Sequence, residues 1–286
     1  MAIDYDVLMA WPFPDVEQTY TEKDTILYAL GVGLGADALD HGQLRYVYEE
    51  GLAALPSMAV VLGYPGMWLR DPGIGIDWVK VLHGEQGFEI HQPLPAEGTV
   101  VGRTKVTGIV DKGAGKGALI YTERTIHDRA NGVQLASLTS TTFCRGDGGF
   151  GGPDGPSKPP HSLPEGKPDE ICDLPTIEQA ALIYRLSGDT NPIHVDPQIA
   201  KAAGFDRPVL HGLCTLGVAS HAILKVCCGY EPSRLKSLRL RFSAPVYPGE
   251  TIRTELWRDG NAVSFRSRVV ERDAVVLNNG YAELSS

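Results

Sequence analysis

The sequence predicts an α+β fold in which two similar units follow one another in a single chain. The segment PLPAEGTV at residues 93–100 returns as PVYPGETI at residues 245–252, and both copies follow a strand-like run. A stretch rich in glycine, proline and charge, residues 146–169, separates the two copies. In each copy, helical patterns precede several runs of alternating polar and apolar residues. An internal repeat of this kind indicates a duplicated unit, with helices packed on an antiparallel sheet.

The first unit covers residues 1–145. A cap at Thr21 predicts a helix over residues 22–33, and apolar residues 52–68 form the expected central helix region, although Pro56 and Pro65 interrupt it. Alternation and β-branched content predict strands at residues 87–92, 99–111, 118–128 and 133–143. The segment GAGKG at residues 113–117 lacks the Ser or Thr that follows Lys in a P-loop, so we expect a turn between two strands.

A linker over residues 146–170 leads into the second unit, residues 171–286. Thr176 and Gln179 have the spacing of a capping box, which predicts a helix over residues 176–188. A loop at residues 189–194, a short helix near residues 197–203 and a long apolar helix over residues 213–228 follow. Four strands are expected at residues 237–244, 251–258, 262–271 and 274–283. This is the pattern of one buried helix wrapped by an antiparallel sheet.

Composition and charge exclude several classes of protein. Hydrophobic residues make up 43% of the chain and charged residues 21%, as in a soluble globular protein with a packed core. A formal net charge of −9 argues against a nucleic-acid or anionic-membrane surface. The longest apolar stretches, residues 52–63 and 213–229, are too short or too interrupted to span a bilayer. We therefore expect neither a nucleic-acid partner nor a membrane partner.

The cysteines and the two ends of the sequence indicate in which cellular compartment the protein is expected. Five cysteines are an odd number without metal-ligand spacing, so we expect no disulfide framework and no metal site. The first six residues carry two acids rather than a charged and then apolar leader. The final residues, ELSS, carry no peroxisomal tripeptide. These features predict a cytoplasmic protein.

The candidate site is the stretch YRLSGDTNPIH at residues 184–194. Gly188 and Pro192 disfavour a continued helix and predict an ordered loop between them. Asp189 and His194 could activate one water between them, because both accept a proton near neutral pH in their free forms. The alternative is structural, since Asp and Asn before Pro commonly form turns and a following His commonly packs. Spacing alone favours the structural interpretation.

The whole string closely resembles the signature of the (R)-specific enoyl-CoA hydratases, also called hydratase 2 or MaoC-like dehydratases. The resemblance continues through AGF at residues 203–205 and PVLHGLCT at residues 208–215. It implies a hot-dog fold for each unit, hence a double hot-dog, and it assigns the catalytic pair of D-x-N-P-x-H to Asp189 and His194. The first unit has no such motif, because its Asp40 and His41 are adjacent. One active site per chain is expected.

The resemblance assigns further residues to the site. Gly212 would donate its N–H to the thioester oxyanion, as the free N–H at the start of a long helix can. Asn191 either orients the catalytic pair or closes an Asx turn. His211 either caps the helix or lies near the pocket, and the structural role is favoured. From the residues alone, His83 would be a surface turn, Lys112 a solvated charge and Phe242 a core residue. The full set of expected substrate contacts is His83, Gly84, Lys112, Asp189, Thr190, Asn191, Pro192, Ile193, His194, Gly212 and Phe242.

The expected function is reversible hydration of a trans-2-enoyl-CoA to the (3R)-3-hydroxyacyl-CoA in fatty acid metabolism, with no metal or redox cofactor and with a homodimer as the assembly. The first, non-catalytic unit would accommodate the acyl chain, and its lining would include Met58, Val60, Leu62 and Met67, each of which could also be core. Three alternatives stay open: an acyl-CoA thioesterase, a non-catalytic acyl-CoA binding partner of a heteromeric dehydratase, and a dehydratase acting on an acyl-carrier protein.

Overall fold

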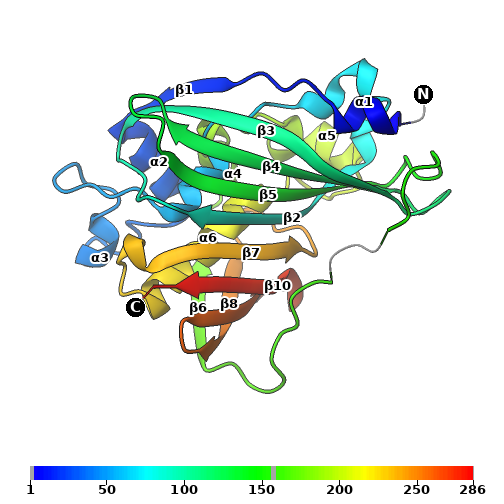
Figure 1. Ribbon diagram of the computed structural model, residues 1–286. Helices are drawn as coiled ribbons and strands as arrows, with labels where there is room; N and C mark the ends of the chain where they lie inside the picture. Colours follow the sequence, from blue (N-terminus) through cyan, green and yellow to red (C-terminus); the bar gives the residue numbers. More distant parts are fainter. Residues whose placement is uncertain (1–2, 156–158, 286) are drawn as a thin grey trace.

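A computed structural model describes residues 3–155 and 159–285. Ten strands form one antiparallel sheet in the order β1-β3-β4-β5-β2-β7-β10-β9-β8-β6 (Figure 1). The first five strands in the chain form one half of the sheet and the last five form the other half. The halves join where β2 (Val81–Ile90) pairs with β7 (Leu235–Phe242), with Gly87 opposite Arg239. The predicted α+β class, with two sheets joined side by side, is confirmed.

The first half contains the four predicted strands and one that was not predicted. These are β1 (Val16–Tyr20), β2, β3 (Gly98–Asp111), β4 (Ala118–Asp128) and β5 (Gln134–Cys144). The predicted first helix is α2 (Glu22–Gly31), where Thr21 and Asp24 form a capping box. Two short helices, α1 (Tyr5–Met9) and α3 (His41–Leu44), were not predicted. Residues 112–117 form the expected turn between β3 and β4.

The central helix predicted for residues 52–68 is wrong. The chain instead forms the 3-10 segment η1 (Pro56–Val61), and η2 (Trp68–Arg70), η3 (Pro72–Ile74) and η4 (Trp78–Lys80) follow. Gly63 adopts the left-handed region with φ of 55°, and a Cβ atom on Gly102 of β3 would lie 2.2 Å from the Gly63 carbonyl oxygen. Because the two backbones touch at this crossing, the chain leaves the helical path after one 3-10 segment.

The second half follows the predicted order closely. Its strands are β6 (Glu170–Pro175), β7, β8 (Thr251–Asp259), β9 (Ala262–Val269) and β10 (Ala274–Leu284), of which only β6 was not predicted. The long helix α6 (Gly212–Cys227) is almost wholly buried, packs on β6, β7 and β8, and lies behind the join of β2 and β7 (Figure 1). Shorter segments precede and follow it: α4 (Ala180–Tyr184), η5 (Arg185–Ser187), η6 (Pro192–His194), α5 (Pro197–Ala202) and η7 (Pro232–Arg234).

The capping box predicted at Thr176 is also wrong, and the helix begins later, at Ala180. The Thr176 hydroxyl donates to the Glu250 carbonyl at 2.8 Å and accepts from the Gly249 N–H at 3.0 Å. The Thr176 N–H also donates to the Glu250 carbonyl, at 3.0 Å. This residue therefore extends the pairing of β6 with β8 and is not available to cap a helix.

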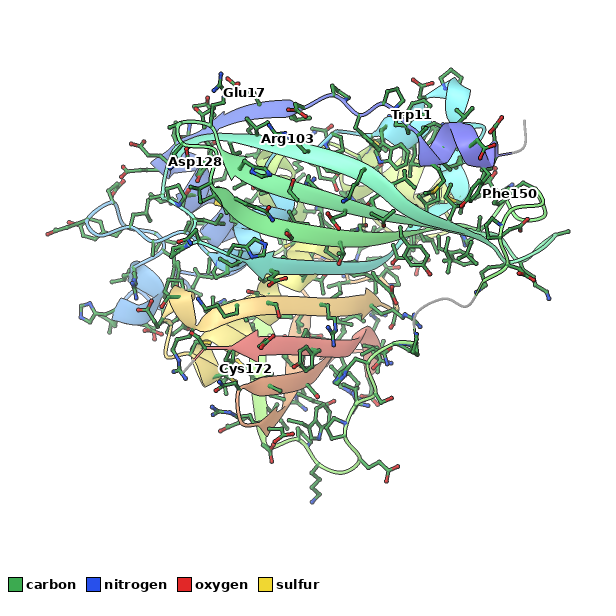
Figure 2. All side chains as sticks on the ribbon, viewed as in Figure 1. Trp11, Glu17, Arg103, Asp128, Phe150 and Cys172 are labelled. Atoms are coloured by element: carbon green, nitrogen blue, oxygen red, sulfur yellow. The ribbon has the colours of Figure 1, made fainter. Side chains whose placement is uncertain are left out.

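Several exposed and connecting features complete the fold. The Asp111 carboxylate, at the end of β3, accepts from the N–H groups of Gly149 and Gly151 in the linker. Residues 156–158 of the linker lie outside the described residues. All five cysteines are buried and unpaired. Arg103 lies on the outer surface near β1 (Figure 2) and pairs with Asp15. Among residues 3–155 and 159–285, no helix has the length and apolarity needed to cross a membrane.

Candidate active site

The loop that follows α4 is shaped by two side chain to backbone turns. Gly188 ends η5 with φ of 117°, which favours glycine. The Asp189 carboxylate then accepts from the Asn191 N–H at 3.1 Å, and the Asn191 amide oxygen accepts from the Ile193 N–H at 3.3 Å. The Asn191 oxygen thus closes the Asx turn, one of the two roles expected for it, and its amide NH₂ group remains for a second role.

The turn brings the Asp189 carboxylate beside two histidines. One ligand atom from each of Asp189, His194 and His211 lies within 4.8 Å of the others. His194 Nδ1 lies 2.8 Å from the Val209 carbonyl oxygen, which only accepts, so Nδ1 carries the proton and Nε2 is left as an acceptor. Burial lowers the pKa of His194 below its usual range, which favours this neutral form.

His211 holds the two candidate catalytic residues in place. Its ring stacks on His194 with the centroids 3.7 Å apart, and its Nε2 donates to the Asp189 backbone carbonyl at 3.2 Å. His211 is the N-cap residue of α6, as expected, but its side chain makes no cap bond. Its ring lies instead beside the two candidate catalytic residues, which was the alternative position for it. Burial and the neighbouring His194 lower the pKa of His211 to about 4. The sequence offered one signal for this position, a His directly before the Gly that opens the long helix.

Gly212, Phe242 and His83 meet at the join of the two halves. Gly212 is the first residue of α6, where the N–H has no acceptor within the helix. A Cβ atom on Gly212 would lie 3.2 Å from the Phe242 ring, whose centroid is 4.7 Å from that of His83. Gly84 lies at the irregularity in the pairing of β2 with β5, and a Cβ atom there would lie 3.1 Å from the Thr141 carbonyl oxygen.

Two residues that the sequence did not indicate, Tyr64 and Arg124, also border this region. The negative charge of Asp189 and the positive charge of Arg124 both act on His83 and on Tyr64. The side chains of His83 and Tyr64 are both exposed, yet protein atoms gather around each of them closely enough to disfavour its charged form. These surroundings lower the pKa of His83 to about 4 and raise the pKa of Tyr64.

The remaining expected contacts are less closely gathered. Lys112 is exposed just after β3, and its ammonium lies 5.7 Å from the Phe143 ring centroid. Met58 and Leu62 line a cavity of about 140 Å³ that reaches Gly188. Val60 and Met67 are not in its lining. A larger surface hollow of about 400 Å³, around η2 to η4, contains none of the candidate catalytic residues.

Comparison with known families divides the chain into two matched parts. Residues 160–279 match the MaoC like domain, and residues 18–146 match the MFE-2 hydratase 2 N-terminal domain. The two matches together cover most of the chain, and the catalytic candidates Asp189 and His194 fall within the first of them.

Curated relatives match along nearly the whole chain. A Dictyostelium discoideum protein named probable enoyl-CoA hydratase 2 is 39% identical over 293 residues, which cover 99% of this chain and 97% of the relative. The Arabidopsis thaliana protein named peroxisomal enoyl-CoA hydratase 2 is 39% identical over 295 residues, which cover 98% of this chain and 94% of the relative.

Solved structures agree with the fold. A MaoC-like dehydratase from Phytophthora capsici has a TM-score of 0.88 and 36% identity, with 99% of this chain and 98% of that chain covered. A Mycobacterium tuberculosis protein described as having a double hotdog fold has a TM-score of 0.58 and 17% identity, with 96% of this chain and 94% of that chain covered. The predicted double hot-dog is confirmed.

Proposed function

Because the chain belongs to the family of MaoC-like dehydratases and hydratase 2 enzymes, we propose that it is an (R)-specific 2-enoyl-CoA hydratase. This hydro-lyase would reversibly add water to a trans-2-enoyl-CoA and form the (3R)-3-hydroxyacyl-CoA. The observation that carries the proposal is the meeting of the Asp189 carboxylate with the His194 ring, whose Nε2 is free to accept a proton. Two proton acceptors that face one small space can activate a water molecule.

The reaction needs a proton to leave water and a proton to reach C2. Water placed between Asp189 and His194 Nε2 loses a proton to this pair as its oxygen bonds to C3. The pair returns a proton to C2, so the enzyme ends in its starting protonation state. His194 can begin as the acceptor because its neutral form is favoured by burial, and its ring orientation is fixed by Val209 and His211.

Negative charge develops on the thioester oxygen during the addition. The N–H of Gly212 would bind this oxygen, since it points from the start of α6 and is aligned with the helix dipole. One such donor is worth about 3 kcal/mol in other oxyanion sites. The Phe242 ring packed against Gly212 helps to exclude water from that position, which strengthens the interaction.

Substrate binding would use both halves of the molecule. His83 and Gly84 would contact the thioester region, and Lys112 would contact a CoA phosphate as a point charge. Thr190, Pro192 and Ile193 would shape the wall beside the reacting carbons. The first unit would hold the acyl chain, with the cavity beside Met58 and Leu62 as the available space.

Cofactors, assembly and location complete the proposed function. We propose that the reaction uses neither a metal nor a redox cofactor, although the spacing of Asp189, His194 and His211 could accommodate an ion. One ring nitrogen of each His already donates to a backbone carbonyl, and the stacked rings favour a positioning role. A homodimer and a cytoplasmic location stay predictions.

The test is to incubate the purified protein with a medium-chain trans-2-enoyl-CoA and resolve the product on a chiral column. Loss of the conjugated thioester absorbance with formation of the (3R)-hydroxyacyl-CoA, and without free CoA, is the expected result. Free CoA as the main product would replace the proposal with a thioesterase. If substrates of no chain length react, the proposal is replaced by a dehydratase that acts on an acyl-carrier protein or by a non-catalytic binding role.

A further inference from the structure

Arg124 is a buried cation without an anionic partner. It occupies an inward position of β4 between the buried Ile120 and Ile126, and its side chain and backbone together are only 9% exposed. Its Nη2 donates to the Val60 carbonyl at 2.6 Å, and the guanidinium carbon lies 5.3 Å from the Tyr64 ring centroid. Within the described residues, no carboxylate pairs with it, and its buried Nε has no hydrogen-bond partner.

The contacts that Arg124 makes within the protein use only part of its hydrogen-bonding capacity. The bond to Val60 holds η1 against the sheet, but it uses one of the five N–H donors of the guanidinium. Burial of a charged group without a partner is unfavourable, and here burial lowers the pKa of Arg124 to about 10. No protein acceptor in the described chain bonds to Nη1, and the Tyr64 hydroxyl likewise has no bonded partner there.

Arg124 lies toward the acyl end of the expected substrate position, away from the expected CoA contact. It is six positions along β4 from Ala118, which adjoins the turn that carries Lys112, and six positions of a strand correspond to about 20 Å. Arg124 also binds η1, the segment that stands where a central helix was expected. It also lies close to the cavity that reaches Gly188, because the η1 residues beside Val60, Val61 and Met58, line that cavity.

We propose that Arg124 is a specificity-determining residue that, together with the Tyr64 hydroxyl, donates hydrogen bonds to an oxygen atom carried by the acyl chain. This inference rests on the proposed hydratase function. The preferred substrates are then trans-2-enoyl-CoA thioesters whose chain bears a hydroxyl, carbonyl or carboxylate oxygen beyond the double bond. The shared chemistry is a hydrogen-bond acceptor, and a carboxylate would in addition neutralise the buried charge.

The experiment compares kcat/KM for enoyl-CoA series of increasing length that end in a methyl, a hydroxyl or a carboxylate group. At one chain length or more, the wild type should favour an oxygenated substrate over its alkyl counterpart by about tenfold or more, as expected for a hydrogen bond to a charged group. Arg124→Met, which keeps a long unbranched side chain, should abolish that preference. Arg103→Met, on the exposed face of β3, is the matched control and should leave the preference unchanged.

The outcomes separate this inference from the proposed function. If the wild type hydrates alkyl substrates but shows no preference at any length, or if Arg124→Met keeps the preference, the role of Arg124 is wrong and the hydratase function stands. If no substrate is hydrated, both are wrong. Should Arg124→Met fail to fold, Arg124→Lys and Tyr64→Phe replace it. Each removes part of the donor set and should reduce the preference, and an unchanged preference in both would overturn the inference.

Discussion

Replacement of His211 tests how the site holds its two reacting groups. The Nε2–H group of His211 donates to the Asp189 carbonyl at 3.2 Å, and its ring stacks on His194 with centroids 3.7 Å apart. A neutral hydrogen bond contributes about 1 kcal/mol, and an aromatic pair contributes about 1 kcal/mol. Both contacts position residues that carry the proposed chemistry. Their loss in His211→Ala should therefore raise the barrier by about 2 kcal/mol, which lowers kcat about 30-fold.

The assay is the steady-state rate of enoyl-CoA hydration, measured beside thermal unfolding. His211→Phe keeps a stacking ring and loses the hydrogen bond, so its kcat should fall by only about fivefold. His221 provides the control, because it is equally buried in α6 and bonds to the Val32 carbonyl and the Tyr230 hydroxyl. His221→Ala should lower stability but not kcat. A kcat for His211→Ala within about threefold of the wild type would refute the positioning role.

Three further predictions concern pH, the oxyanion donor and CoA. Burial lowers the folded-state pKa of His211 and of His221 to about 4. Their contribution to the free energy of unfolding is therefore full above about pH 6.5 and is lost as pH falls toward 4. In denaturant titrations, His221→Phe should lose less of its free energy of unfolding over this pH range than the wild type, and an equal loss would contradict this. Gly212→Ala places a Cβ atom 3.2 Å from the Phe242 ring and should lower kcat about tenfold or more with the fold intact; an unchanged kcat would place the oxyanion donor elsewhere. Lys112→Ala should raise KM more than it lowers kcat, and the reverse pattern would place Lys112 away from CoA.

The strands and α6 could be predicted because their signals are local. Alternation of polar and apolar residues along β3, β4, β8 and β9 marks strands with one buried face, and the nearly continuous apolar run of α6 marks a buried helix. The central helix of the first unit could not be judged in the same way. Most of its apolar residues are buried, although Met67 is exposed, but the close approach of Gly63 to Gly102 arises from tertiary packing that no local pattern shows.

The same distinction holds within the site. Asp189 and His194 lie in one short motif, so their proximity follows from a single turn. The helix cap predicted at Thr176 failed because its partner, Glu250, is 74 residues away and belongs to a strand connection. Tyr64 reaches the site from the segment just after η1, and Arg124 reaches it from β4, across the join of the two halves. The available signal was an arginine at an inward position of an alternating strand.

The most direct test of the catalytic assignment is the hydration rate of Asp189→Asn and His194→Gln with a medium-chain trans-2-enoyl-CoA. Matched controls are Asp206→Asn and His41→Gln, which change exposed residues of the same types. Both catalytic variants should lose most of the turnover while they keep the thermal stability of a folded protein and bind the substrate. Turnover near that of the wild type in either variant would contradict the role of this pair in the reaction.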